Sequence, residues 1–324
     1  MIGALELGLI YGVMALGVYL TFRVLNFPDL TVDGSFTTGA AVAAALITSG
    51  QNPLLATLAG GAAGVVAGII TGLLHTKGKI DGLLAGILTM IALWSINLRI
   101  MDKANLPLLR EETLMTPLRD AGWIGKTWFA VIVFAVILFV LKLVVDWFLS
   151  TDLGLSIQAT GNNEQMIRSF GVDTDGMKIL TLALSNGFVG LAGALVAQYQ
   201  GFTDISMGIG LILIGLASVI VGQAVLGQRN IFMATLAVLV GSILYRLIVF
   251  FALSAGLNPN DMRAITAVLV ILALLLPRWG FLKRFPSLRD RGNRRPLAPD
   301  PTRDPAPDPL ASATTGVTVP GAER

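Results

Sequence analysis

The residues of this chain whose types and spacing could serve a function gather in two polar stretches between long apolar runs. The longer stretch extends from Ser150 to Lys178. Within it, Gly161-Asn162 predicts the start of a helix, because an asparagine side chain can accept hydrogen bonds from the free N–H groups of a first turn. Gly171 can end that helix about two turns later. Such a short helix is marginal in water by itself, so we expect a partner to stabilise it; the alternative is an ordinary solvated loop.

The side chains of this expected helix are suited to binding and not to catalysis. Met166, Ile167 and Phe170 form an apolar side at positions i, i+1 and i+4. Glu164 and Arg168 form a polar pair at positions i and i+4. The residues expected to contact a partner are Gly161, Asn162, Asn163, Glu164, Met166, Ile167, Arg168, Phe170 and Gly171.

The second polar stretch, Asn26–Ser35, adjoins apolar segments on both sides. Irregular backbone at membrane depth is tolerated only where it is buried in protein or lines a cavity. Asp33 or Thr31 could cap the helix that follows, whose positive end would then face that cavity. We expect this stretch to line a solute pathway and to help hold an anionic group; the alternative is a plain turn with a helix cap. The candidate pathway residues here are Asn26, Asp29, Thr31, Asp33 and Ser35.

Ionisable residues also lie within or near the apolar segments, where charge is costly unless it faces protein or water. They are Glu6, Arg99, Arg246 and Arg263. Arg99 and Arg246 join the candidate pathway residues, because they could recognise a carboxylate on the outer side. The alternative is internal ion pairing, or side chains that reach from helix ends towards water.

The composition offers few residues that could form a catalytic site or a metal site. The chain has no cysteine and a single histidine, His75, which cannot build a metal site alone. Gly125-Lys126-Thr127 resembles the end of a phosphate-binding loop, but the glycine required five residues earlier is replaced by Asp120. We therefore expect a protein that is not an enzyme and holds no metal or cofactor of its own.

Composition places the chain in a membrane. It is 54% hydrophobic and 13% charged, against about 25% charged residues in soluble domains. Such a chain has too little polar surface to cover its core, so lipid is the expected solvent. We predict an all-α polytopic bundle of about 8–10 spans. Nine apolar segments can be drawn, Gly3–Phe22, Asp33–Thr48, Pro53–Leu74, Ile80–Met101, Thr127–Leu149, Lys178–Tyr199, Met207–Leu226, Ile231–Leu253 and Met262–Leu276.

The third segment carries a row of glycines four residues apart, which are Gly60, Gly64, Gly68 and Gly72. Because residues at this spacing share one helix face, the row predicts a groove against which a second helix can pack closely; the alternative is a groove for the substrate.

The distribution of Lys and Arg predicts the orientation of the spans. Several basic residues follow the last segment, so we expect the C-terminal side to be cytoplasmic and the N-terminus to be outside. The loop Asp102–Lys126 runs against this rule, because it would be external and yet contains four basic residues. We expect residues 1–285 to form the membrane domain and the Pro-rich residues 286–324 to form a disordered cytoplasmic tail.

Several motifs resemble the permeases of ATP-binding-cassette importers of the branched-chain amino acid and ribose type. The resemblance covers about Met1–Gly280. Within this type, the motifs are most similar to those of a subgroup of amino-acid permeases, some of them linked to tryptophan or tyrosine uptake. The stretches that carry it are Gly8–Gly17, Arg23–Ser35, Gly39-Ala40, Gly154–Ala159, Gly161-Asn162-Asn163, Arg168, Gly171 and Leu184–Leu195.

The resemblance implies one half of a dimeric permease, expected to pair with an identical subunit in the inner (plasma) membrane of a prokaryote. Two ATPases would dock on the loop that matches Gly161–Gly171, and they alone would bind ATP and magnesium. An extracytoplasmic binding protein would deliver the solute, an amino acid or related nutrient, and no nucleic acid would take part. The alternative is an ATP-independent secondary transporter or channel, which would need acidic residues at mid-membrane; we find only Glu6 and Asp33 near such positions.

Overall fold

The computed structural model describes residues 1–228, 230–256, 264, 266–268 and 271. These belong to a unit that spans Met1–Trp279, and the tail predicted from residue 286 onwards lies outside the described residues. The longer helices are α1 (Ile2–Tyr19), which continues into the π-helical turn η1 (Leu20–Val24), α2 (Thr31–Thr48), α3 (Pro53–Thr76), α4 (Gly82–Met101), α6 (Trp128–Ser150), α9 (Thr174–Gln200), α10 (Leu211–Leu226) and α11 (Ile231–Ser254). The shorter elements are α5 (Thr116–Asp120), α7 (Asp152–Asn162), α8 (Glu164–Ser169) and the strands β1 (Asn105–Pro107) and β2 (Phe202–Asp204).

The prediction of an all-α polytopic bundle is confirmed. Six segments of the described residues are long and apolar enough to cross a membrane: Ile2–Val24, Pro53–Thr76, Gly82–Met101, Trp128–Ser150, Thr174–Gln200 and Ile231–Ser254. Two further helices, α2 and α10, coincide with predicted segments but are shorter, with 18 and 16 residues. The ninth predicted segment lies largely outside the described residues.

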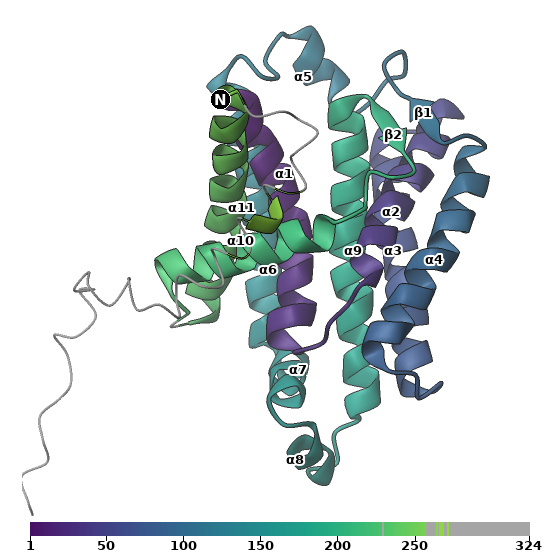
Figure 1. The fold of residues 1–324 in the computed structure, drawn as a ribbon, viewed down its shortest axis with the longest axis vertical. Coiled ribbons are helices and arrows are strands. Elements are labelled where there is room, and N and C mark those ends of the chain that lie inside the picture. The colour runs from purple at the N-terminus through teal and green to yellow at the C-terminus, as the bar shows by residue number, and fades with distance from the viewer. Residues whose placement is uncertain (229, 257–263, 265, 269–270, 272–324) are drawn as a thin grey trace, which may run out of the picture. The chain divides into compact units, whose positions relative to one another are not determined.

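Helix α9 is the centre of the packing, and α1, α2 and α3 lie against it (Figure 1). The glycine row of α3 faces α9. A Cβ atom at Gly64 would lie 2.2 Å from the Asn186 carbonyl oxygen, and one at Gly68 would lie 2.2 Å from that of Leu182. Gly72 faces Ile179 in the same way, and Gly60 meets both Ala194 of α9 and the backbone of α2 at Gly39. The absence of side chains therefore lets the backbone of α3 approach its neighbours closely along about three turns.

We expect Gly68→Ala to destabilise the bundle, because the added methyl group would meet backbone atoms that cannot move independently. Overpacking of this kind costs about 1–3 kcal/mol. The melting temperature of the purified protein in detergent should fall. Ala62→Val, which adds two methyl groups at an exposed position of the same helix, is the matched control. Equal melting temperatures for the two variants would contradict the packing role of Gly68.

The two ends of the bundle are built differently. At the upper end in Figure 1 lie the N-terminus, α5 and a two-stranded antiparallel sheet in which Leu106 of β1 faces Thr203 of β2. At the lower end lie α7 and α8. The loop before α6 is tied to the N-terminal end, because the buried Glu6 carboxylate accepts hydrogen bonds from the Gly125 N–H at 3.0 Å and the Tyr199 hydroxyl at 2.7 Å.

Candidate functional site

Two helices begin inside the bundle instead of at its ends. In Figure 1, α2 and α10 both start at mid-height, and α10 runs across the view while α9 runs along it. Their first turns meet, because the Asp33 carboxylate accepts hydrogen bonds from the backbone N–H groups of Gly210 at 2.7 Å and Ile212 at 2.9 Å. Gly208 makes this approach possible, since a Cβ atom there would lie 2.0 Å from the Asp33 carbonyl oxygen.

One part of the prediction for Asp33, that it could cap its own helix, is wrong. It does not cap its own helix; its negative charge lies at the N-terminus of α10, 177 residues further along the chain, where unpaired N–H groups favour an anion. The start of α2 is held by Asp29, whose Oδ1 accepts from the Thr31 N–H at 2.9 Å. The other oxygen of Asp29 accepts from the Asn186 amide of α9 at 2.7 Å.

The remaining predicted residues of this stretch position the helix start. The Thr31 hydroxyl is buried and lies 2.8 Å from the Thr71 hydroxyl of α3. Ser35 is fully buried, and its hydroxyl has no hydrogen-bond partner among the described residues. Asn26 is exposed and adopts a positive φ of 59°, at the turn where the chain leaves η1. The stretch is thus a fixed connection that returns the chain from one end of the bundle into its interior.

A cavity of about 380 Å³ lies beside Asp33, between α2, α4 and the loop before α10. Its lining includes Asp33, Thr37, Met90, Trp94, Asn97 and Ile209. Three of these residues lie on α4 and are absent from the sequence-based candidates. Their signal in the sequence was weak, because Asn97 is one of several polar residues in a mostly apolar helix.

Arg246 lies on the other side of the same loop. It lines a second cavity of about 230 Å³ together with Gly210 and Tyr245, and Ile209 borders both cavities. Its guanidinium group stacks on the Tyr11 ring, with 3.8 Å from Cζ to the ring centroid. Arg99 differs, because it is exposed on α4. The structure therefore brings Arg246 and Asp33 to opposite sides of the start of α10, and Arg263 lies outside the described residues.

The sequence analysis missed a pair of charges inside α6. Lys142 is completely buried and forms an ion pair with Asp146 at 2.5 Å, and Asp146 also accepts from the Thr235 hydroxyl of α11 at 2.6 Å. The i, i+4 spacing of two opposite charges in a strongly apolar helix was a signal that could have revealed the pair. Because each charge has its partner within the protein, the pair joins α6 to α11.

The predicted partner-binding stretch forms two helices instead of one. Gly161 and Asn162 end α7, and α8 starts one residue later than predicted, with Asn163 Oδ1 accepting from the Met166 N–H at 3.0 Å. Gly171, with a φ of +86°, follows α8. Gly161 packs directly against the end of η1, since a Cβ atom there would lie 2.1 Å from the Val24 carbonyl oxygen.

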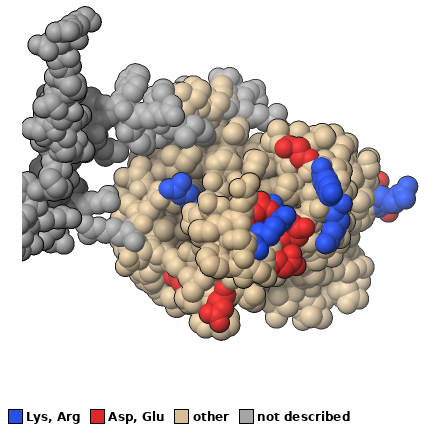
Figure 2. All heavy atoms as spheres, turned by 90° about the horizontal axis from the view of Figure 1, so that it is seen from below, with Lys and Arg blue, Asp and Glu red and all other residues tan. Residues whose placement is uncertain are grey.

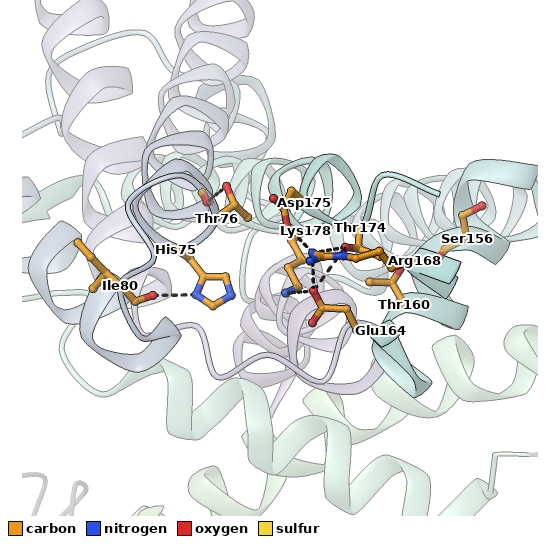
Figure 3. A network of polar contacts seen from close by, with 11 residues as sticks. His75, Thr76, Ile80, Ser156, Thr160, Glu164, Arg168, Thr174, Asp175 and Lys178 are labelled. Carbon is orange, nitrogen blue, oxygen red and sulfur yellow. Dashed lines mark hydrogen bonds and ion pairs between the residues drawn. The ribbon is translucent and has the colours of Figure 1, made fainter. Parts of the chain in front are cut away.

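The polar pair of α8 lies at the surface and binds residues at the start of α9 (Figure 3). Arg168 donates to the Thr174 hydroxyl at 2.8 Å and to carboxylate oxygens of Glu164 and Asp175 at 3.1 Å each. Glu164 is also paired with Lys178 at 2.8 Å. This network fixes α8 to the first turns of α9 and leaves other side chains free to meet a partner. Met166 and Phe170 are 49% and 74% exposed, and Ile167 is half-buried.

The same end of the bundle carries a cluster of charged side chains. Figure 2, viewed from below, shows Lys, Arg, Asp and Glu side by side on one part of this face. A cavity of about 480 Å³ lies there, lined by His75, Lys79, Asp81, Glu164, Arg168 and Lys178. The His75 Nδ1 lies 2.9 Å from the Ile80 carbonyl oxygen, which orders the turn between α3 and α4 (Figure 3). The face therefore combines a charged hollow with the exposed apolar tip of α8.

The attachment of α8 should depend on pH in a defined direction. The hydrogen bond from the Lys178 ammonium, followed by the charges of Lys178 and Arg168, lowers the pKa of Glu164. A lowered pKa means that the stabilisation is complete above the ordinary glutamate value of about 4.3 and is lost as the pH falls through the lowered value. At pH 7, Glu164→Gln should therefore speed hydrogen exchange of the α8 amides, normalised to intrinsic rates.

Measuring the native protein and Glu164→Gln over a range of pH tests whether the pKa of Glu164 is lowered. The difference between the native protein and Glu164→Gln should disappear only at a pH below the ordinary glutamate pKa. Gln165→Ala, at the exposed neighbouring position, is the control and should exchange like the native protein. A difference that vanishes well above pH 4.3 would contradict the proposed pairing of Glu164.

Comparison with known proteins gives these features a common context. The family described as branched-chain amino acid transport system, permease component, matches residues 1–276. The chain belongs to this family. The resemblance noted in the sequence is thereby confirmed, and the chain is a multi-pass membrane protein that serves as the permease component of a transport system.

The relatives of this permease are named for the transport of different solutes. The tyrosine transport system permease protein of Clostridioides difficile is 41% identical over 273 residues, which cover 84% of this chain and 90% of that protein. The ribose import permease protein of Bacillus subtilis is 28% identical, over 83% of this chain and 81% of that protein. The galactofuranose transporter permease protein of Escherichia coli is 25% identical, over 86% and 79%. No solved structure matches the chain.

Proposed function

We propose that this permease is the membrane-spanning subunit of an ATP-driven importer for a small solute, an amino acid or a related nutrient. The docking site for a separate ATPase consists of Met166 of α8 and Phe170, which directly follows α8. That ATPase alone binds ATP and magnesium. The observation that carries this proposal is the geometry of α8. Its charged side chains are used to fix the helix to α9, while a large aromatic side chain is left 74% exposed on a polar face.

The structure contains a short physical route from this docking site to the interior. Helix α8 follows α7 directly, and α7 touches the end of η1 at Gly161. From η1 the chain runs into the connection before α2, and the first turn of α2 holds the start of α10 through Asp33. A displacement of α8 by the ATPase would therefore reach the two half-buried helix starts through packed backbone.

The other parts of the proposed importer follow from the family resemblance. A second permease subunit, identical to this one, completes the pathway, and an extracytoplasmic binding protein delivers the solute at the end that carries α5 and the strands. The complex lies in the inner (plasma) membrane of a prokaryote, with α7, α8 and the C-terminal tail in the cytoplasm. The tyrosine transport permease, at 41% identity, supports an amino acid as the cargo.

Co-purification tests the assembly. The permease is extracted from its native membrane in mild detergent, and the proteins that accompany it are identified by mass spectrometry. We expect a P-loop ATPase in the complex, and ATP-dependent solute uptake when the complex is placed in proteoliposomes. A complex without ATPase, under conditions that keep a known importer intact, would favour the alternative of an ATP-independent transporter or channel.

A further inference from the structure

We propose that this permease has a regulatory binding site for a carboxylate anion at its cytoplasmic end, and that an occupied site slows the transport cycle. The site is the cavity between η1, α7, the end of α10 and the start of α11. This inference rests on the proposed function, which places this end of the bundle in the cytoplasm beside the ATPase.

The cavity is large, polar and open to water. Its volume is about 640 Å³, and Asn162 and Asn230 at its wall are exposed, so a water-soluble ligand can enter. The cavity beside Asp33 differs, because most of its lining is apolar and its charged group is a carboxylate. The polar lining residues of the larger cavity include Tyr19, Arg23, Gln158, Asn162, Gln223 and Asn230.

A chain of three side chains fixes the direction of the hydrogen bonds at this cavity. The Arg23 guanidinium group can only donate, and it donates to Oε1 of Gln228 at 2.5 Å. The amide nitrogen of Gln228 is therefore the donor to Oε1 of Gln223, also at 2.5 Å. Gln223 thus uses its oxygen as the acceptor, and its amide nitrogen has no hydrogen-bond partner among the described residues.

The unpaired nitrogen of Gln223 determines which kind of ligand the site favours. Gln223 is 9% exposed, and a buried polar atom without a partner costs free energy that a suitable ligand recovers. Because this atom is a donor, an oxygen acceptor recovers that free energy, whereas an ammonium group or an apolar chain does not. Arg23 adds further N–H donors beyond the one that binds Gln228.

The charge of the cavity favours a carboxylate over a phosphate. Arg23 is the one charged side chain among the described lining residues. Its single positive charge balances a carboxylate, and a guanidinium group matches the two oxygens of a carboxylate. A phosphate group carries about −1.5 charges or more at neutral pH, which one arginine does not balance. Asp146 does not offset Arg23, because it lies outside the lining and is paired with Lys142.

The elements around the cavity belong to the route from the ATPase to the interior of the bundle. Helix α7 ends at Asn162 and touches η1 at Gly161, and Gln223 lies on α10, whose start is held by Asp33. An anion in contact with both Arg23 and Gln223 would hold η1 and α10 at a fixed separation. A ligand that binds one state of a cycle more tightly slows the departure from that state.

Binding to the complex of permease and ATPase in nanodiscs tests the site. The probes are N-acetylglycine, a carboxylate without an ammonium group, and its uncharged amide, N-acetylglycinamide. Calorimetric titration should detect the acid and not the amide, and saturating acid should lower the rate of ATP hydrolysis at constant ionic strength. Arg23→Gln should raise the Kd of the acid about tenfold or more, because it removes a charge-assisted hydrogen bond. Gln223→Met, which keeps the side-chain length without the donor, should raise it less.

Lys77→Gln is the matched control. It removes one positive charge from an exposed position directly after α3, two residues from His75 and outside the cavity lining. This variant should bind the acid like the native complex. Native affinity in both Arg23→Gln and Gln223→Met would overturn the site, as would equal binding of the acid and the amide. Binding of the acid that leaves ATP hydrolysis unchanged would overturn its regulatory role.

A second pair of probes, L-leucine and L-leucinamide, identifies the source of the carboxylate. Similar affinities for N-acetylglycine and L-leucine would assign the site to cytoplasmic carboxylates in general, and binding of L-leucine without N-acetylglycine would assign it to an imported amino acid after its release. Binding of inorganic phosphate in place of either acid would overturn the choice of a carboxylate. The proposed function fails in a different way, because the permease would then purify without an ATPase.

Discussion

Phe170→Ala should weaken the binding of the ATPase to this permease at least about 30-fold. Phe170 is 74% exposed at the tip of the lower end, beside Met166, which is 49% exposed. Aromatic side chains that fill a partner's pocket commonly contribute 2 kcal/mol or more to binding, and 2 kcal/mol corresponds to about 30-fold. The variant should therefore lose co-purified ATPase and ATP-dependent uptake. Titration of the purified ATPase onto the permease in nanodiscs measures the change in Kd.

The fold of the variant should be intact, because substitutions of exposed residues away from special features usually change stability by less than about 0.5 kcal/mol. Leu109→Ala is the matched control. Leu109 is 71% exposed but belongs to the loop beside β1, at the opposite end of the bundle. Native affinity in Phe170→Ala, together with native affinity in Met166→Ala, would show that α8 is not the docking site.

Asp33→Ala should reduce transport by about tenfold or more while leaving the ATPase attached. Its carboxylate is the acceptor for the N–H groups of Gly210 and Ile212, so the substitution leaves two part-buried donors at the start of α10 without this partner. Each such donor costs about 1–3 kcal/mol when it stays unpaired, and the start of α10 should therefore unwind or shift. Uptake in proteoliposomes and hydrogen exchange over residues 208–214 are the measurements.

Two further variants separate this role from general damage to α2. Asp33→Asn keeps one acceptor oxygen and should show an intermediate loss, because it can satisfy only part of the same N–H pair. Thr48→Ala lies at the exposed end of the same helix and should transport normally. Fast exchange at 208–214 in the native protein, unchanged by Asp33→Ala, would contradict the cap between α2 and α10.

Some features depend on local composition and spacing, and these could be predicted from the order of the residues alone. A charged fraction of 13% leaves too few polar groups to cover a soluble core, so a membrane bundle followed directly. Eight of the nine predicted apolar segments correspond to helices of the structure, since hydrophobic length is a property of consecutive residues. The groove of Gly60, Gly64, Gly68 and Gly72 was predictable for the same reason, because a four-residue spacing places them on one face.

Other features depend on which distant residues meet, and these became evident only from the folded chain. Asp33 looked like the cap of its own helix, yet it holds the start of α10 because the loop after β2 returns into the bundle at Gly208. Glu164 and Arg168 were predicted to contact a partner, and the structure adds that they pair with residues in the first turns of α9. The cavity beside Trp94 and Asn97 had no clear sequence signal, because it forms only where α4 meets α2 and that returning loop. Long-range packing sets these pairings, and residue spacing within one segment does not encode them.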